Sequence, residues 1–333
     1  MKKTTLLFSA LLLALTFGLI RGQYAQFGHW IYSHATDLEA SLYGFEQQTI
    51  DIGEMSLALY NNQPTTNNQP QNNNQPTNNK QQQSDRPVIV MLHGYSADKD
   101  VWPRFARHLS DDYHIIIPDM AGHGDSPFDP GWDYSMPAQA NRLALLLDRL
   151  GIRQVHIIGN SMGGFLSATF AIHYPHRVLS ATMIDPAGVV APELSDMARM
   201  LARGDNPFLI HNRTEFDDFY AMTMEQPPFL PDIVLEAVGQ SYIERRHQLE
   251  KIFADFHASD YLDQQLHRLT APALLWWGDK DRLLHVSSVA VWQQGVNNLQ
   301  VEIWPGIGHM PMVEQPAEAA DKYRHFLTTL AAE

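Results

Sequence analysis

Three residues of the chain have the types and the order needed for nucleophilic attack on a carbonyl carbon. Ser161 lies at the centre of a G-x-S-x-G motif, and Asp281 and His309 follow it along the chain. A serine hydroxyl becomes a good nucleophile when a neutral imidazole accepts its proton, and a carboxylate must fix the tautomer of that imidazole and stabilise its charged form. The three side chains therefore predict a Ser–His–Asp triad that works through a covalent acyl-enzyme.

The residues on either side of Ser161 predict a strand, a sharp turn and a helix. A stretch from Val155 to Asn160 that is rich in β-branched apolar residues precedes the serine, and a helical stretch from Phe165 to Tyr174 follows it. Gly159 and Gly163 allow the backbone to turn sharply and the strand and helix to pack closely, which exposes the hydroxyl at the turn. The alternative is a glycine-rich turn that contains an ordinary serine, and the flanking elements favour the catalytic interpretation.

The acid and the base are each predicted to lie just after a strand. A strand from Pro272 to Trp277 is followed by Asp279 and Asp281, and a strand from Leu299 to Trp304 leads to His309. Open α/β sheets bind their ligands at the carboxyl ends of the strands. The order Ser, Asp, His along the chain is that of the α/β-hydrolase arrangement. Position alone does not choose between the two aspartates.

An earlier strand end is a candidate for an oxyanion site. The apolar run from Pro87 to Leu92 predicts a strand with both faces covered, and it is followed by His93, Gly94 and Tyr95. A backbone N–H at such a strand end can point at the charge that develops on a carbonyl oxygen. The candidate donor is the N–H of Tyr95, and the simpler alternative is that His93 and Gly94 only turn the chain.

A second polar loop is predicted to have a structural role. It runs from Asp119 to Ser126 and includes His123 and Asp125. These residues precede Ser161, and polar glycine-rich loops usually hold themselves together with internal hydrogen bonds. We therefore do not assign the loop a catalytic function.

Strands alternate with helices along most of the chain, which predicts an α/β fold with a mostly parallel sheet and helices on both faces. The predicted core comprises residues 46–189 and 270–333. Residues 61–85 form an Asn/Gln-rich insertion that is predicted to be disordered. Between the two parts of the core, residues 190–269 predict an inserted helical cap rich in Met and aromatic residues. Those side chains either line an apolar pocket or simply form a small helical core.

Composition excludes several classes of function. The chain has 333 residues, of which 44% are hydrophobic, and a formal net charge of -14, which argues against a nucleic-acid partner. With no cysteine in the sequence, thiolate catalysis and cysteine–zinc sites are excluded. The sequence contains no dinucleotide-binding fingerprint, P-loop or H-E-x-x-H pattern, so we expect neither a cofactor nor a metal.

The first 22 residues predict an export segment. Lys2 and Lys3 precede an uncharged, Leu-rich run from Thr4 to Ile20, and Arg21 follows without a small-residue cleavage site. We favour a signal anchor over a cleaved signal peptide, with residues 23–45 as a connecting helix. The charge pattern then predicts a protein held in the inner membrane and facing the periplasm, or a secreted protein if the segment is cleaved. The oligomeric state is left open.

Six segments resemble those of the α/β-hydrolase superfamily, and among its members they are similar to bacterial lipases and esterases and to membrane-anchored monoacylglycerol lipases. The segments are HGYSADKDVW, GHGDSP, GNSMGG, DPAG, WGDKDR and GIGHMPMVEQP. The resemblance implies an α/β-hydrolase fold and a serine carboxylic-ester hydrolase for monoacylglycerols or medium-chain esters. It also implies Ser161 as nucleophile, His309 as base, Asp281 as the acid, and the backbone N–H groups of Tyr95 and Met162 as oxyanion donors. The Asn/Gln-rich insertion departs from the family pattern.

Three other interpretations of the sequence remain. Haloalkane dehalogenases and epoxide hydrolases share the scaffold but use an aspartate nucleophile, so Ser161 argues against them. Carbon–carbon bond hydrolases and aminopeptidases keep the serine, and a substrate screen would separate them from esterases. A non-catalytic binding protein is the alternative from another class, and the complete triad argues against it.

Overall fold

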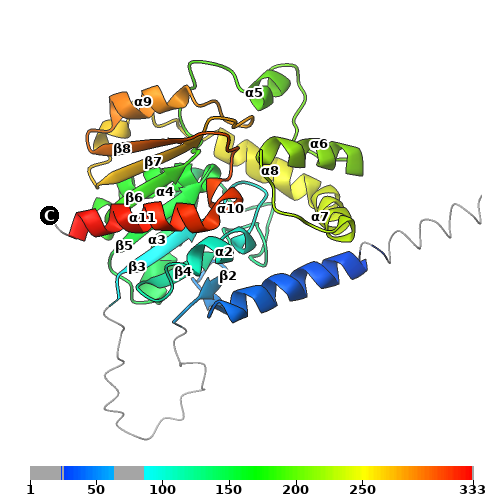
Figure 1. Cartoon of the computed structure of the whole chain (residues 1–333), viewed down its shortest axis with the longest axis horizontal. Helices are drawn as coiled ribbons and strands as arrows, with labels where there is room; N and C mark the ends of the chain where they lie inside the picture. Colours follow the sequence, from blue (N-terminus) through cyan, green and yellow to red (C-terminus); the bar gives the residue numbers. More distant parts are fainter. Residues whose placement is uncertain (1–23, 25, 64–85, 332–333) are drawn as a thin grey trace, which may run out of the picture.

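The computed structural model describes residues 24, 26–63 and 86–331 (Figure 1). The predicted export segment, residues 1–22, lies outside the described residues, and so does most of the Asn/Gln-rich insertion. Within the described ranges, no helix combines the length and the apolar character that crossing a membrane requires.

A single eight-stranded sheet forms the centre of the molecule, with the order β1-β2-β4-β3-β5-β6-β7-β8. Its strands are β1 (Glu46–Asp51), β2 (Ser56–Asn61), β3 (Val88–Leu92), β4 (His114–Pro118), β5 (Val155–Asn160), β6 (Val178–Ile184), β7 (Ala273–Gly278) and β8 (Leu299–Trp304). The β1–β2 and β2–β4 pairs are antiparallel, and all later neighbours are parallel. The predicted α/β class with a mostly parallel sheet is therefore confirmed.

Helices cover both faces of this sheet (Figure 1). The core helices of four or more residues are α2 (Pro103–Ala106), α3 (Met136–Arg149), α4 (Met162–His173), α9 (Ser288–Gly295), α10 (Pro311–Glu314) and α11 (Pro316–Ala331). The first long one, α3, begins after Ser135, because the Ser135 hydroxyl accepts a hydrogen bond from the N–H of Ala138 and so caps the helix.

Successive side chains of a strand point to opposite faces of the sheet, which explains why the core has one part on each face. On β3, Ile89 and Met91 pack into the cluster under α2 and α11, whereas Val90 and Leu92 pack into the cluster that contains residues of α3 and α4. All four side chains are buried. A continuous apolar strand is stable only when both of its faces are covered, and this is why the central strands show no polar alternation.

Four helices between β6 and β7 form the inserted cap at one end of the sheet (Figure 1). They are α5 (Asp196–Leu201), α6 (Arg213–Thr223), α7 (Asp232–Glu244) and α8 (Arg246–His257). Helices α6 and α7 are joined by the Arg213 guanidinium, which contacts Asp217, Asp232 and Glu236 at 2.7 to 2.8 Å. The cap therefore has its own ionic connection in addition to its apolar contacts.

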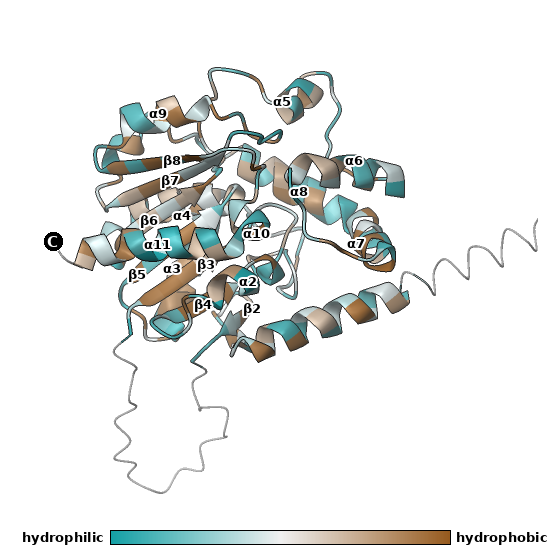
Figure 2. Ribbon diagram, in the orientation of Figure 1, coloured by the Kyte–Doolittle hydropathy of each residue, from teal (hydrophilic) through white to brown (hydrophobic). Residues whose placement is uncertain are grey.

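A further helix, residues 26–42, precedes the sheet and lies beside the cap (Figure 1). A Cβ at Gly28 would lie only 2.2 Å from the carbonyl oxygen of Ile233 in α7, so glycine is what permits this close approach. Figure 2 shows hydrophobic residues in several turns of the helix. Some of them are exposed, namely Phe27 55%, Trp30 55%, Leu38 60% and Leu42 76%.

Candidate active site

Ser161 occupies the sharp turn between β5 and α4. Its backbone is in an unusual left-handed conformation, with φ 59 and ψ -117. The turn is held by three backbone hydrogen bonds: the Ser161 N–H donates to Ile184 at 2.9 Å, and the Ser161 carbonyl accepts from Phe165 at 3.0 Å and from Ala187 at 3.1 Å. A strained, non-glycine conformation held by its surroundings is typical of a functional position.

The glycines of the motif permit the close packing that the sequence predicts. A Cβ at Gly159 would lie 2.1 Å from the Gly163 oxygen, and one at Gly163 would lie 2.3 Å from the Leu92 oxygen. Any larger residue at either position would push the helix away from the strand. The elbow is therefore pressed against the carboxyl end of β3, where the predicted oxyanion loop begins.

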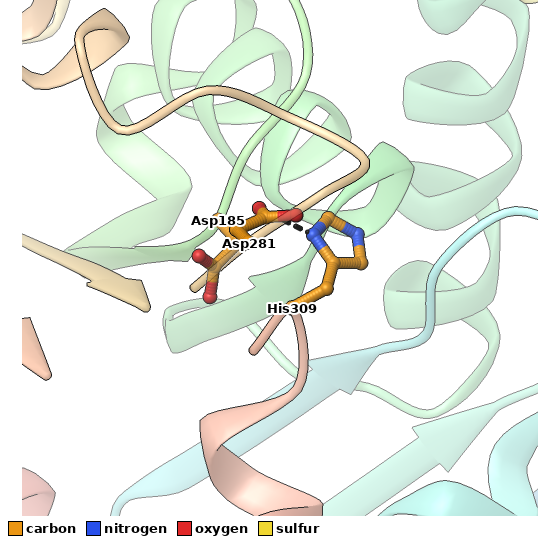
Figure 3. A group of neighbouring side chains, drawn as sticks. All are labelled: Asp185, Asp281 and His309. Atoms are coloured by element: carbon orange, nitrogen blue, oxygen red, sulfur yellow. Dashed lines mark hydrogen bonds and ion pairs between the residues drawn. The ribbon is translucent and has the colours of Figure 1, made fainter. Parts of the chain in front are cut away.

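Asp281 and His309 lie together although 28 residues separate them (Figure 3). Nδ1 of His309 is 2.7 Å from Oδ2 of Asp281, and both side chains are almost completely buried. Oδ1 of Asp281 accepts hydrogen bonds from the N–H groups of Leu283 at 2.8 Å and Leu284 at 3.0 Å. Because this carboxyl group accepts from three donors, it is arranged for the ionised form.

The geometry separates the two candidate acids. Asp279 is used elsewhere, because its Oδ1 accepts a hydrogen bond from the Gly306 N–H at 2.7 Å. It holds the turn after β8, whereas Asp281 contacts the imidazole. The structure thus brings together His309 and the aspartate that the family resemblance implies.

The second ring nitrogen of His309 is placed to act as a general base. Nδ1 is hydrogen-bonded to Asp281, and Nε2 is buried without a hydrogen-bond partner among the described residues. In the neutral tautomer that donates from Nδ1, Nε2 is the acceptor. The Ser161–His309 hydrogen bond is not formed in this structure, and such contacts often tighten only when substrate binds.

Asn160 connects the nucleophile strand to the base, a role that the sequence does not indicate. Its Nδ2 donates to the His309 carbonyl at 2.8 Å and to the Ile184 carbonyl at 3.2 Å. The residue directly before Ser161 therefore fixes the backbone of the base. Its place inside the GNSMGG segment is the one signal that points to it.

Glu314 is a second residue that sequence reasoning misses. One of its oxygens accepts from the Gly308 N–H at 2.9 Å, and the other accepts from Glu225 at 3.0 Å and Gln226 at 2.7 Å. The His309 N–H also donates to the carbonyl of Thr223 at 3.0 Å. The loop that carries the base is thus bound directly to the end of cap helix α6.

The two predicted oxyanion donors lie on either side of the elbow. Met162 is the first residue of α4, a position where the N–H has no intrahelical acceptor and adds to the positive end of the helix dipole. A Cβ at Gly94 would lie 3.2 Å from Cβ of Ser161, so the loop that carries Tyr95 packs directly against the nucleophile. An oxyanion role for both N–H groups stays a prediction.

Buried histidines stabilise the Tyr95 loop. Burial lowers the pKa of His93 to about 4, so its ring is neutral, and it bonds to the Gly94 carbonyl at 2.8 Å and accepts from the Met120 N–H at 3.0 Å. The ring of His123 packs 5.1 Å from that of His93, and burial lowers the pKa of His123 well below its usual range. Neutral imidazoles add no positive charge that would attract the oxyanion.

The polar loop after β4 has the structural role that the sequence predicts. Lys99 is buried and pairs with Asp119 at 2.9 Å and with Asp125 at 2.6 Å. The N–H of Asp125 also donates to Asp119 at 2.9 Å. These contacts hold the loop to the segment after Tyr95 and leave Asp119 and Asp125 no part in the triad.

One cluster of the described residues has the composition of a metal site. Atoms of Asp185, Asp281 and His309 all lie within 4.8 Å of one another. The distance of 2.7 Å between His309 Nδ1 and Asp281 Oδ2 is that of a direct hydrogen bond. We therefore interpret the cluster as a hydrogen-bonded group.

The fold and the elbow define a hydrolase. The chain belongs to the α/β hydrolase fold family, whose sequence pattern matches residues 87–316. It is 33% identical over 249 residues to lipase 1 of Psychrobacter immobilis, covering 74% of this chain and 78% of that protein. It is 28% identical over 258 residues to the monoacylglycerol lipase abhd6-B of Xenopus laevis, covering 74% and 77%.

A solved structure covers almost the whole chain. It is described as a membrane phospholipase A and a novel bacterial virulence factor, with a TM-score of 0.83, 31% identity, and coverage of 99% of this chain and 100% of that one. Together the comparisons confirm the predicted family and the predicted class of enzyme, an ester hydrolase of the lipase and esterase type.

Proposed function

We propose that the protein hydrolyses monoacyl and medium-chain carboxylic esters through an acyl-enzyme on Ser161. The observation that carries this proposal is the strained Ser161 elbow at the start of α4, on a fold that also pairs Asp281 with His309 at 2.7 Å. The similarity to a monoacylglycerol lipase supports the substrate class.

The proposed mechanism assigns one role to each of these groups. Oγ of Ser161 attacks the ester carbonyl carbon while Nε2 of His309 takes its proton. The N–H groups of Met162 and Tyr95 donate hydrogen bonds that stabilise the negative charge on the carbonyl oxygen. The C–O bond then breaks, and the alcohol leaves with the proton from His309. Water, activated by the same imidazole, releases the acid from Ser161, and Asp281 stays ionised throughout.

An aromatic cluster beside Tyr95 supports an apolar acyl site. The Tyr95 ring lies 4.9 Å from Phe208, 5.5 Å from Phe253 and 5.4 Å from Phe256, and Phe208 lies 5.1 Å from Phe219. The Tyr95 hydroxyl donates to the Leu249 carbonyl of α8 at 2.6 Å. The residue proposed to stabilise the oxyanion is thus anchored in the cap, so an acyl chain bound there would lie against aromatic side chains.

We expect ester specificity to rise with acyl length and then fall. Each methylene buried against the cap contributes about 0.8 kcal/mol, which is roughly a fourfold gain in kcat/KM per methylene until the apolar site is full. The measurement is kcat/KM for a series of p-nitrophenyl esters, with monoacylglycerol and triacylglycerol assayed beside them. Medium-chain and monoacyl esters should exceed both acetate and long-chain triacylglycerol.

The same series separates the alternatives. A steady decline from acetate upward would indicate a small pocket and contradict the lipid-like substrate. Hydrolysis of a vinylogous diketone or an aminoacyl amide with no ester turnover would favour a carbon–carbon bond hydrolase or an aminopeptidase.

A second proposal concerns location: the N-terminal segment attaches the enzyme to a membrane and leaves the catalytic domain on the outer side. Support comes from the apolar sequence between Thr4 and Ile20, from exposed Phe27 and Trp30 on the helix that follows, and from the likeness to a membrane phospholipase A. Aromatic side chains of this kind favour the interface between lipid and water.

Membrane attachment predicts a defined fractionation. The full-length chain, expressed in a Gram-negative host, should sediment with membranes, resist a carbonate wash and be digested by protease added to spheroplasts. A variant that begins at residue 24 and carries a cleavable export signal is the control and should become soluble. Recovery of the full-length protein in the soluble fraction, with a new N-terminus after residue 22, would indicate a cleaved signal peptide instead.

A further inference from the structure

Asp185 is a second carboxyl group beside the acid of the triad. It directly follows β6, its side chain is 0% exposed, and its backbone has a positive φ of 43. The Asp185 N–H donates to the Trp276 carbonyl at 2.9 Å. The surrounding sheet therefore holds Asp185 in a conformation that aspartate rarely adopts.

The two oxygens of Asp185 have different surroundings. Oδ1 accepts a hydrogen bond from the Gly278 N–H at 2.8 Å, and Oδ2 is buried with no donor from the described residues. Figure 3 draws this carboxyl group next to that of Asp281, on the side away from the imidazole. An ionised oxygen with no donor in a buried site is strongly destabilised.

Only one of the two neighbouring carboxyl groups can be ionised easily. Asp281 accepts hydrogen bonds from His309, Leu283 and Leu284, which stabilise its negative charge. Among the described residues, Asp185 accepts one, from the Gly278 N–H. Two buried carboxyl groups at this separation share one charge, and the proton resides on the group with fewer donors. That group is Asp185.

The neighbouring carboxylates of Asp281 and Glu314 act on Asp185 in the same direction as burial. Burial, first, and then the negative charge of Asp281 raise the pKa of Asp185 well above its usual range. The carboxylate of Glu314, from α10, adds to this effect, and the Gly278 hydrogen bond opposes it. The imidazole of His309 lies beyond Asp281.

We propose that Asp185 is a positioning residue that keeps a proton on Oδ2 and donates it in a hydrogen bond to the carboxylate of Asp281. The inference deepens the proposed function and rests on it. Asp281 then has a fourth donor, which fixes the carboxylate opposite Nδ1 of His309. The shared proton also makes Asp281 less basic, so His309 loses its own proton at lower pH and can accept that of Ser161.

Two substitutions of similar size test the proposal. D185N keeps the carbonyl that accepts from Gly278 and replaces the O–H donor by an amide N–H, and D185L removes both. In D185L we expect kcat to fall by about tenfold or more with little change in KM, and the acid limb of the kcat/KM profile to move up by about one pH unit. D185N should restore most of kcat and the position of the acid limb.

A folding measurement keeps the test valid if D185L does not fold. An unfolded aspartate is ionised at neutral pH, so the wild-type chain must take up a proton at Asp185 when it folds. This uptake lowers the free energy of unfolding, and the loss increases as pH rises above the pKa of the unfolded aspartate. The amide of the D185N variant needs no proton. The melting temperature of D185N relative to wild type should therefore increase between pH 5 and pH 8.

The outcomes are distinct. The inference would be overturned if the acid limb of D185N moved to lower pH. It would also be overturned if the melting temperature of D185N fell relative to wild type as pH rises. Either result would mean that Asp185 is ionised. A D185L enzyme with an unmoved acid limb would overturn the inference as well. Labelling of Ser161 by a fluorophosphonate in the wild type is run in parallel, because its failure would instead contradict the proposed function.

Discussion

Replacement of Ser161 by alanine is expected to lower the turnover of a p-nitrophenyl ester by about 10⁴-fold or more. The acyl-enzyme cannot form without Oγ, and the activity that remains comes from the oxyanion site and from substrate binding. The backbone at φ 59 is equally demanding for serine and alanine, so the fold should be kept. Turnover is measured with a medium-chain ester, and folding by the melting temperature.

A buried serine on the same helix provides the control. Oγ of Ser167 donates to the Gly163 carbonyl at 2.8 Å and lies against the elbow, but it has no place in the proposed chemistry. S167A should keep turnover within about tenfold and should still be labelled by a fluorophosphonate. If S161A retained turnover, or if labelled wild-type enzyme carried the reagent on another residue, the assignment of the nucleophile would be wrong.

The sequence predicts the core elements because their signals are local. The strand before Ser161 is rich in β-branched apolar residues, and the helix after it is stopped by Pro175, so both could be placed without knowing their neighbours. The short helix α9, at Ser288–Gly295, is not predicted, because its apolar side is formed by few residues and depends on packing against the sheet. The order of the strands in the sheet cannot be predicted from local sequence patterns either.

Contacts that shape the site depend on tertiary structure. Asn160 reaches the carbonyl of His309 across 149 positions, and Asp185 reaches the Gly278 N–H across 93. Neither pair has a spacing that marks it in the sequence. The sequence spacing also does not decide between Asp279 and Asp281, because only the turn after β7 determines which carboxylate faces the imidazole.

These contacts also connect the cap to the proposed catalytic groups. The loop with His309 is bound to Thr223 and Glu225 of the cap region, and the Tyr95 hydroxyl is bound to Leu249 of α8. Because the proposed base and one proposed oxyanion donor are both bound to the cap, we expect a substrate that fills the apolar cluster to affect the contacts that hold these groups.

The second large loss of turnover is expected when the proposed acid, Asp281, is replaced. Asp281→Asn should lower turnover by about 10⁴-fold, because an amide at this position can present its N–H to Nδ1 and favour the wrong tautomer of His309. Asp185 cannot replace the lost carboxylate, since the amide introduced by the substitution would still separate it from the imidazole. The loss should be in kcat more than in KM, because Asp281 is buried behind His309 and does not meet the substrate.

Asp279→Asn is the matched control, two residues away and on the same turn. Within the part of the chain that the structure describes, its carboxylate accepts from the Gly306 N–H alone and pairs loosely with Lys280 at 3.7 Å. An asparagine carbonyl can accept the same hydrogen bond. We expect less than about a tenfold change in kcat, and Ser161 should remain reactive toward a fluorophosphonate in this variant. The reverse ranking of the two variants would transfer the role of the acid to Asp279 and would require the loop after β7 to rearrange when substrate binds.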